Sequence, residues 1–246
     1  MSTGPAPAFV LQDISKVYGG LRPLRVRSLV VPAGAVIALT GVDAPAAETL
    51  VNLLTGATLP DTGEVRVFGR ATSEITDADE WLTTVDRFGI VSDRAVLLDE
   101  LTAAQNLAMT LTLDIEPLPA DVKATVERLA SDIALDPTLL DRKVATLSAA
   151  EKLGVRLGRA VALAPAIVLL EHPTATLPRA EVAGFAGLVA ALARARQLTV
   201  LALTADAEFA PALTREVYTL VPADGSLVPL GRGAWEKLKG LFGGRR

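Results

Sequence analysis

Residues 35–56 read AVIALTGVDAPAAETLVNLLTG, and this stretch decides the fold class. Its first part, 35–40, is a continuous apolar run that predicts a buried strand ending at Gly41. After a short loop, the spacing of Leu50, Leu53 and Leu54 predicts a helix over 47–55 with one apolar face. Strand, loop and helix in this order begin the unit from which parallel sheets are built.

A second unit of this kind lies further along the chain. Residues 167–170 and 198–204 are apolar runs that predict buried strands. Pro178 opens a predicted helix between them, with apolar residues at helical spacing: Val182, Phe185, Val189 and Leu192. Two buried strands joined by a helix indicate a parallel sheet.

Alternating patterns flank these units. Residues 9–31 alternate apolar and polar side chains around a Gly-Gly turn at 19–20, which predicts two antiparallel strands, and 63–68 predicts another strand of that sheet. Residues 217–230, VYTLVPADGSLVPL, predict a hairpin that turns at Asp224-Gly225. The fold class is therefore α/β, with a mainly parallel core sheet and an N-terminal antiparallel β part.

The middle of the chain has a helical pattern. Helices are predicted over 77–87 and 120–133, with a short strand at 88–92. Ser148, followed three residues later by Glu151, forms the capping-box pattern and predicts a helix that runs to about residue 163.

We expect one domain over 1–246. Its core comprises 1–92 and 164–246, and about 93–163 forms a helical part. The last residues, 234–246, predict a short amphipathic helix and a basic tail.

Composition excludes several classes of function. A composition of 50% hydrophobic and 21% charged residues is typical of a folded chain, and a net charge of -4 provides no basic field for nucleic acid. The absence of cysteine excludes disulfides and thiolate sites, and the single histidine, His172, excludes sites that need two imidazoles. The N-terminal residues lack a signal-peptide pattern, and no uncharged run approaches the roughly 18 residues of a membrane span, so we expect a cytoplasmic protein.

Five segments, in this order, resemble the nucleotide-binding subunit of ABC transporters: VYGG at 17–20, GVDAPAAET at 41–49, LSAAE at 147–151, VLLEHPT at 168–174 and LTAD at 203–206. In that family these positions hold an adenine-stacking aromatic, the Walker A loop, the signature, the Walker B strand and the switch histidine. The resemblance covers nearly the whole chain. It implies the P-loop NTPase-like ABC ATPase fold.

The Walker A segment departs from the family pattern. A phosphate loop needs glycines that let backbone N–H groups curl around the phosphate, a lysine, and a hydroxyl for magnesium. Gly41 and Thr49 are kept, whereas Ala47 stands at the lysine position and Glu48 at the first hydroxyl position. Pro45 also removes an N–H donor.

The change of charge in this segment disfavours phosphate binding. A unit charge pair at about 5 Å and an effective dielectric constant of about 20 is worth roughly 3 kcal/mol. Glu48 replaces a neutral hydroxyl, and Asp43 adds a further repulsion. We therefore expect weak or absent binding of ATP and Mg²⁺, and no other cofactor.

The hydrolytic positions implied by the resemblance are replaced as well. Asp93 stands at the position of the Q-loop glutamine, and Glu171 and His172 stand where the family has the Walker B Asp and Glu. Pro178 replaces an aspartate that communicates across the dimer, and Ala205 replaces the switch histidine. Together with Ala47, these replacements predict that hydrolysis has been lost.

Three residues at motif positions have two interpretations each: the retained Tyr18 and Ser148 and the replacement His172. Tyr18 either stacks on adenine or packs at a strand end, and Ser148 either serves a partner's ATP or only caps a helix. His172 is either a general base or a histidine at the end of a strand that is hydrogen-bonded at an interface. Thr49 and Glu171 are the candidate contacts for a metal ion.

Three functions remain open. The first is a pseudo-ATPase that docks on an integral-membrane ABC permease, through the surface around Asp93 and 99–113, and pairs with an active ABC ATPase subunit or with itself. Such a protein would be peripheral on the inner face of the cytoplasmic membrane. The second is an ATP-binding switch that uses Tyr18, Thr49 and Glu171. The third is a soluble scaffold derived from the ABC fold, without a membrane partner.

Overall fold

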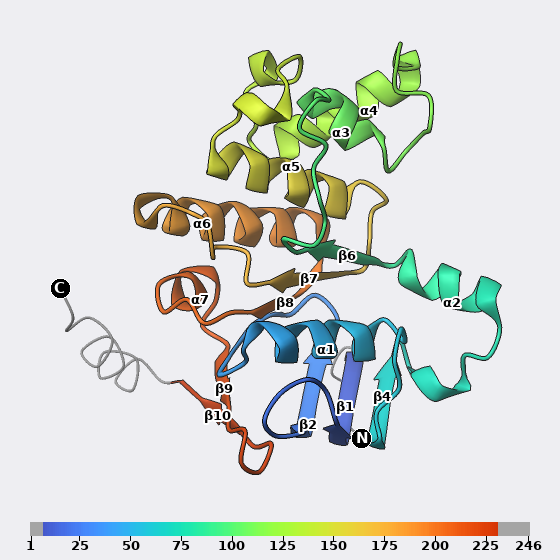
Figure 1. Ribbon diagram of the computed structural model, residues 1–246, viewed down its shortest axis with the longest axis vertical. Helices are drawn as coiled ribbons and strands as arrows, with labels where there is room; N and C mark the ends of the chain where they lie inside the picture. The colour runs from blue at the N-terminus through green and yellow to red at the C-terminus, as the bar shows by residue number, and fades with distance from the viewer. Residues whose placement is uncertain (1–6, 231–246) are drawn as a thin grey trace.

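The computed structural model describes residues 7–230, which form two sheets with helices between and around them (Figure 1). A four-stranded sheet has the order β2-β1-β4-β5. Its strands are β1 (Pro7–Lys16), β2 (Leu24–Pro32), β4 (Thr62–Val67) and β5 (Arg70–Ala71), and neighbouring strands are antiparallel. The predicted N-terminal antiparallel sheet is confirmed.

The larger sheet has six strands in the order β10-β9-β3-β8-β7-β6. These strands are β3 (Val36–Thr40), β6 (Phe88–Val91), β7 (Ile167–Glu171), β8 (Thr199–Leu203), β9 (Val217–Leu220) and β10 (Leu227–Pro229). All pairs are parallel except the hairpin of β9 and β10. The predicted parallel core and C-terminal hairpin are therefore confirmed.

Seven α-helices lie within residues 7–230: α1 (Ala44–Leu54), α2 (Ala78–Val85), α3 (Ala103–Ala108), α4 (Ala120–Asp132), α5 (Ala149–Val161), α6 (Arg179–Arg196) and α7 (Phe209–Leu213). Short 3-10 turns cover Thr72–Glu74, Pro137–Leu139 and Val144–Thr146. The periodicity did not predict α3 and α7, because helices of six and five residues are too short to show a helical repeat. Thr102 and Gln105 form a capping box at α3, and the Asp206 carboxylate accepts from the N–H groups of Glu208 and Phe209 where α7 begins.

One predicted boundary was wrong. The helix predicted over 47–55 begins three residues earlier, at Ala44. Asp43 is its N-cap, and Pro45 lies in the first turn, where a missing N–H costs no helical hydrogen bond. The loop that the resemblance implied at these positions is therefore largely replaced by helix.

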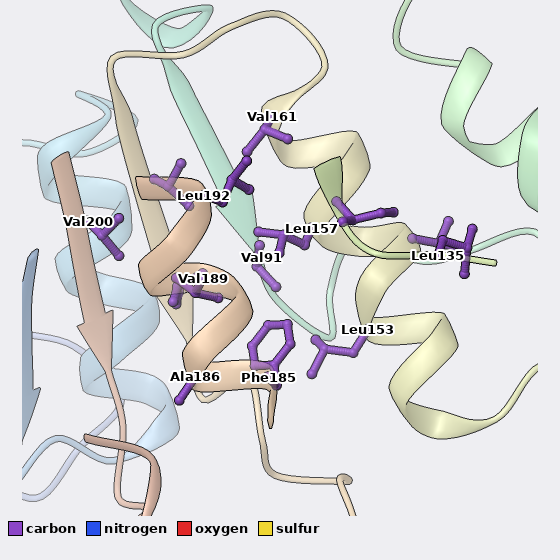
Figure 2. Packing of buried hydrophobic residues seen from close by; sticks show 14 of the residues in the cluster. Val91, Leu135, Leu153, Leu157, Val161, Phe185, Ala186, Val189, Leu192 and Val200 are labelled. Carbon is purple, nitrogen blue, oxygen red and sulfur yellow. The ribbon is translucent and has the colours of Figure 1, made fainter. Parts of the chain in front are cut away.

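The two faces of the large sheet bury separate cores. Along β8, Val200 and Ala202 point to one face, and Leu201 and Leu203 point to the other. The first face packs on α5 and α6, where Val91, Leu157, Phe185 and Val189 meet (Figure 2). The second face packs on α1 and the antiparallel sheet. Aliphatic side chains dominate both cores, as the low aromatic content predicted.

The predicted C-terminal helix and tail at 234–246 lie outside the described residues. Within 7–230, no helix combines the length and apolar character that crossing a membrane requires.

Candidate functional site

The candidate site lies where parallel strands end side by side. The last residues of β3, β7 and β8 are Thr40, Glu171 and Leu203, and β6 runs on into the segment with Asp93 and Arg94. Carboxyl ends of parallel strands share one edge of a sheet, and ligands of α/β folds bind at such edges. The topology therefore brings the Walker A, Walker B, glutamine and switch positions together.

The first turn of α1 uses its own hydrogen-bond donors. The Asp43 carboxylate accepts from the backbone N–H of Ala46 at 2.8 Å, and the Asp43 carbonyl accepts from the N–H of Ala47 at 2.9 Å. Pro45 has no N–H to offer. Asp43, which the sequence suggested only as a repulsive charge, thus occupies the position at a helix N-terminus that would attract an anion.

The Walker A lysine position, Ala47, and the retained hydroxyl, Thr49, also make their contacts within the chain. Ala47 is fully buried in the core beneath the antiparallel sheet, so its side chain faces away from solvent. The Thr49 hydroxyl donates to the carbonyl of Pro45 at 2.7 Å. In this arrangement the N–H groups of Ala46 and Ala47 and the Thr49 hydroxyl are all bonded within residues 43–49.

An arginine that the motif comparison did not single out bridges the site. Arg94 Nη2 donates to Glu171 Oε2 at 2.6 Å, and its Nη1 donates to Glu48 Oε1 at 2.9 Å. The Glu171 side chain is 9% exposed, whereas those of Arg94 and Glu48 are about half exposed. We call these three residues the Arg94 bridge.

The Arg94 bridge changes the electrostatics inferred from the sequence. The hydrogen bond to Glu171 is the main cause that raises the pKa of Arg94; burial opposes it, and both carboxylate charges add to it. Glu48 is therefore paired rather than free, and the bridge as a whole keeps one negative charge. The cation that Glu171 contacts is a guanidinium.

Tyr18 and Gly41 line a common pocket of about 360 Å³ with Asp43. The Tyr18 ring lies over Gly20, where an added Cβ would approach Tyr18 Cζ to 2.5 Å. Burial, followed by the charge of Asp43, raises the pKa of Tyr18. Gly41 adopts φ +79°, and a Cβ there would meet the carbonyl of Leu220 at 2.5 Å, so this turn requires glycine.

His172 lies in strained backbone at the end of β7. Its φ is +43°, a region that side chains larger than glycine rarely adopt, and its Nε2 is buried without a hydrogen-bond partner among the described residues. The expected hydrogen bond of His172 at an interface stays a prediction, and within the described residues His172 Nε2 has no partner. His172, Thr174, Ala205 and Asp206 line a pocket of about 210 Å³.

Asp206 holds the segment after β8 to the segment after β7. Its carboxylate accepts from the Thr174 hydroxyl at 2.7 Å, from Arg179 at 2.9 Å and from the backbone N–H groups of Glu208 and Phe209 at the start of α7. Burial acts to raise the pKa of Asp206, but these hydrogen bonds outweigh it and lower the pKa below 3.8. Ala205 beside it is exposed, and Pro178 is the exposed N-cap of α6 without a side-chain hydrogen bond.

Asp93 and Ser148 face other elements. Asp93 is exposed and lies 3.2 Å from Arg156 of α5. Ser148 caps α5, where its hydroxyl accepts from the N–H of Glu151 and its own N–H donates to Glu151. The capping box is confirmed, and Ser148 lines neither the pocket of Tyr18 nor that of His172.

The structure thus joins Glu48 with Glu171 and joins Tyr18 with Gly41. Sequence reasoning missed Arg94, although Glu48, a carboxylate where the family has a hydroxyl, was a signal for a nearby cation. Within residues 7–230, no group of three or more His, Asp or Glu side chains is arranged to hold a metal ion.

Comparison with protein families and curated sequences identifies similar proteins. Residues 24–175 match the family model described as ABC transporter. The chain is 32% identical over 198 residues to the lipoprotein-releasing system ATP-binding protein LolD of Saccharophagus degradans, covering 80% of this chain and 85% of that protein. It is 31% identical over 233 residues to the ribose import ATP-binding protein RbsA 2 of Streptomyces avermitilis, covering 92% of this chain. It spans only 44% of that relative's length.

Solved structures share the fold at low sequence identity. The structure of cbiO1 from Clostridium perfringens, part of an ABC transporter complex, aligns with a TM-score of 0.78 at 17% identity and covers 96% of each chain. The dimeric ATP-binding cassette MJ0796 bound to ADP and Pi aligns with a TM-score of 0.72 at 20% identity, covering 91% of this chain and 99% of that one.

Proposed function

Because the chain belongs to the ABC transporter family of ATP-binding proteins, we propose that it is a transporter's nucleotide-binding-domain subunit that has lost ATP hydrolysis, a pseudo-ATPase. The observation that carries this proposal is the first turn of α1. Its cap by Asp43 and the missing N–H of Pro45 leave few donors for a phosphate. The replaced positions Ala47, Asp93, His172 and Ala205 agree with it.

The charge of the Arg94 bridge supports the same conclusion. One net negative charge about 5 Å from a phosphate, at an effective dielectric constant of about 20, costs roughly 3 kcal/mol per unit charge of the phosphate. Since about 1.4 kcal/mol corresponds to tenfold in affinity, a micromolar site becomes weaker by on the order of 100-fold. We expect binding of MgATP no tighter than millimolar, once the lost lysine is included.

We propose an integral-membrane ABC permease as the partner, with an active ABC ATPase subunit or a second copy completing a dimer. The surface around Asp93 and 99–113 is the proposed docking face. Val96, Leu98 and Leu113, in or beside this segment, are 66%, 43% and 96% exposed, and such apolar side chains are available to a partner. The protein then resides on the inner face of the cytoplasmic membrane through the permease.

The test is isothermal titration of the full chain with MgATP, beside an active ABC ATPase as positive control. We expect saturable heat from the control and none below millimolar ATP from this chain. Micromolar binding by the chain alone would overturn the proposal.

A second candidate is an ATP-binding switch with residual nucleotide binding, which the shared pocket of Tyr18, Gly41 and Asp43 favours. It predicts micromolar heat in the same titration and loss of that heat in Tyr18→Ala. Membrane fractionation distinguishes the pseudo-ATPase and the ATP-binding switch from the third candidate, a soluble scaffold. Constant association of the chain with membranes excludes the scaffold.

A further inference from the structure

A pocket of about 540 Å³ opens in the helical part of the chain, between α3, α4 and the turn at Pro137–Leu139. These helices lie at one end of the molecule (Figure 1). The pocket is larger than those of Tyr18 and His172 and shares no residue with either. A volume between about 300 and 1,000 Å³ is typical of sites that hold small organic molecules. We call it the helical pocket.

The floor of the helical pocket is apolar. Val126 and Leu140 are 1% and 9% exposed, and Ala104, Ile115 and Leu118 are partly buried beside them. All five side chains belong to, or pack against, the core that joins α3, α4 and α5. A ligand with an apolar body would remove water from these side chains, which is favourable in proportion to the area covered.

The rim of the helical pocket is charged. It carries three carboxylates, Glu116, Glu127 and Asp141, and one ammonium group, Lys123, which leave a net charge of -2. All four side chains are exposed, and none of them forms an ion pair or a hydrogen bond within residues 7–230. The ion pairs of the helical part join other residues: Lys143 with Glu100, and Lys152 with Asp99. The rim therefore holds negative charge that the chain itself does not neutralise.

Floor and rim together select one class of ligand. An anion would be repelled by the net charge of the rim, and a neutral apolar molecule would cover the floor without pairing any carboxylate. An amine on an apolar body satisfies both requirements, because its ammonium group donates charge-assisted hydrogen bonds to the carboxylates while its body covers the floor. Each exposed charge pair is weak by itself, so the preference for a cation comes from three carboxylates around one ammonium group.

We propose that the helical pocket binds a small organic cation, an alkylamine or arylamine. Its apolar body lies over Val126 and Leu140, and its ammonium group lies among Glu116, Glu127 and Asp141. This inference goes beyond the proposed function, because it requires neither ATP nor a permease. Although α3 also belongs to the proposed docking face at 99–113, the ligand of the helical pocket is a small molecule and not a segment of a protein.

The test uses three probes that share one apolar body and differ in the charge of the head group: 4-phenylbutylamine, 4-phenylbutan-1-ol and 4-phenylbutanoate. Each probe is titrated into the full chain with labelled Ile, Leu and Val methyl groups, and binding is followed by NMR. We expect the amine to shift the methyl signals of Ile115, Leu118, Val126 and Leu140 saturably. It should bind at least about tenfold more tightly than the butanoate, with the alcohol between them.

Variants separate the rim from the floor. Glu127→Gln combined with Asp141→Asn should weaken binding of the amine by about tenfold and leave binding of the alcohol unchanged. Glu181→Gln, exposed on α6 and outside the pocket, is the matched control and should bind all probes as the native chain does. Ala104→Leu fills part of the pocket and should abolish binding of all three probes. Urea unfolding of each variant checks that the fold is intact.

Salt provides an independent readout. Raising the salt concentration from about 50 mM to about 500 mM should weaken binding of the amine severalfold and leave the alcohol unaffected, because charges at an exposed rim are screened.

Two outcomes would overturn the proposal. If the amine and the butanoate bind with equal affinity, the carboxylates do not select the ligand. If the amine leaves the four methyl signals unshifted, the helical pocket is not a site for this class of molecule. Neither outcome bears on the proposed function, which the titration with MgATP tests separately.

Discussion

Replacing Arg94 by methionine removes the cation of the Arg94 bridge and leaves Glu171 without a partner. A charge pair about 4 Å apart at an effective dielectric constant of about 20 is worth roughly 4 kcal/mol. The Arg94 side chain is 46% exposed, so solvent screening reduces the inner pair to about 2 kcal/mol. The outer pair with Glu48 adds under about 1 kcal/mol, because both of its side chains are half exposed.

We therefore expect Arg94→Met to lower the free energy of unfolding by about 2–3 kcal/mol and Glu48→Gln by about 0.5 kcal/mol. The assay is urea unfolding of the full chain at pH 7, followed by circular dichroism. Most of the stability lost in Arg94→Met comes from the Glu171 carboxylate, which is 9% exposed and left without a cation. Adding Glu171→Gln to this variant should therefore recover part of the lost stability.

Two results would refute this reasoning. One is an Arg94→Met variant within about 0.5 kcal/mol of the native chain, the usual range for surface substitutions. The other is a double variant with Glu171→Gln that is less stable than Arg94→Met alone.

The remaining predictions concern a buried position, a cap and a carboxylate. Ala47→Lys should destabilise the chain by several kcal/mol without creating ATP binding, because position 47 is fully buried. Glu48→Lys, at a half-exposed position beside Arg94, should cost only about 1 kcal/mol. An Ala47→Lys variant that keeps native stability and binds MgATP would contradict this. Ser148→Ala should cost about 1 kcal/mol and speed amide exchange in the first turn of α5, while Ser148→Asp should retain native exchange. The lowered pKa of Asp206 means that its charged form stabilises the fold above about pH 4 and that this contribution is lost as the pH falls through the folded-state value. Asp206→Asn should therefore flatten the fall of stability between about pH 5 and pH 3, and an unchanged slope would show that Asp206 is not its source.

Local patterns predicted most of the fold. The strands β3, β7 and β8 were read from apolar runs, and the start of α5 from Ser148 and Glu151, because these signals lie within a few residues of each other. The start of α1 was misplaced because the spacing of Leu50, Leu53 and Leu54 locates only the apolar face of the helix, although Asp43 followed by Pro45 is itself a helix-start pattern.

The Arg94 bridge could not be read from any local pattern. Arg94 lies 46 residues from Glu48 and 77 residues from Glu171 in the chain, and only the sheet order brings them together. The order of the motifs correctly predicted that these residues lie at the carboxyl edge of the parallel sheet. It did not give the orientation of the Thr49 hydroxyl or the burial of Ala47, which depend on the first turn of α1.

Under the proposed function, the Asp43 cap determines how a phosphate loop could be introduced into this chain. Removing the cap alone weakens α1, and placing a lysine at position 47 alone buries a charge, so neither single change is favourable. Gain of binding requires the helical turn at 44–46 to unwind and the new side chain to arrive together. Single substitutions selected one after another for nucleotide affinity would therefore lower stability before they raise affinity. A library that varies residues 43–48 simultaneously avoids this problem.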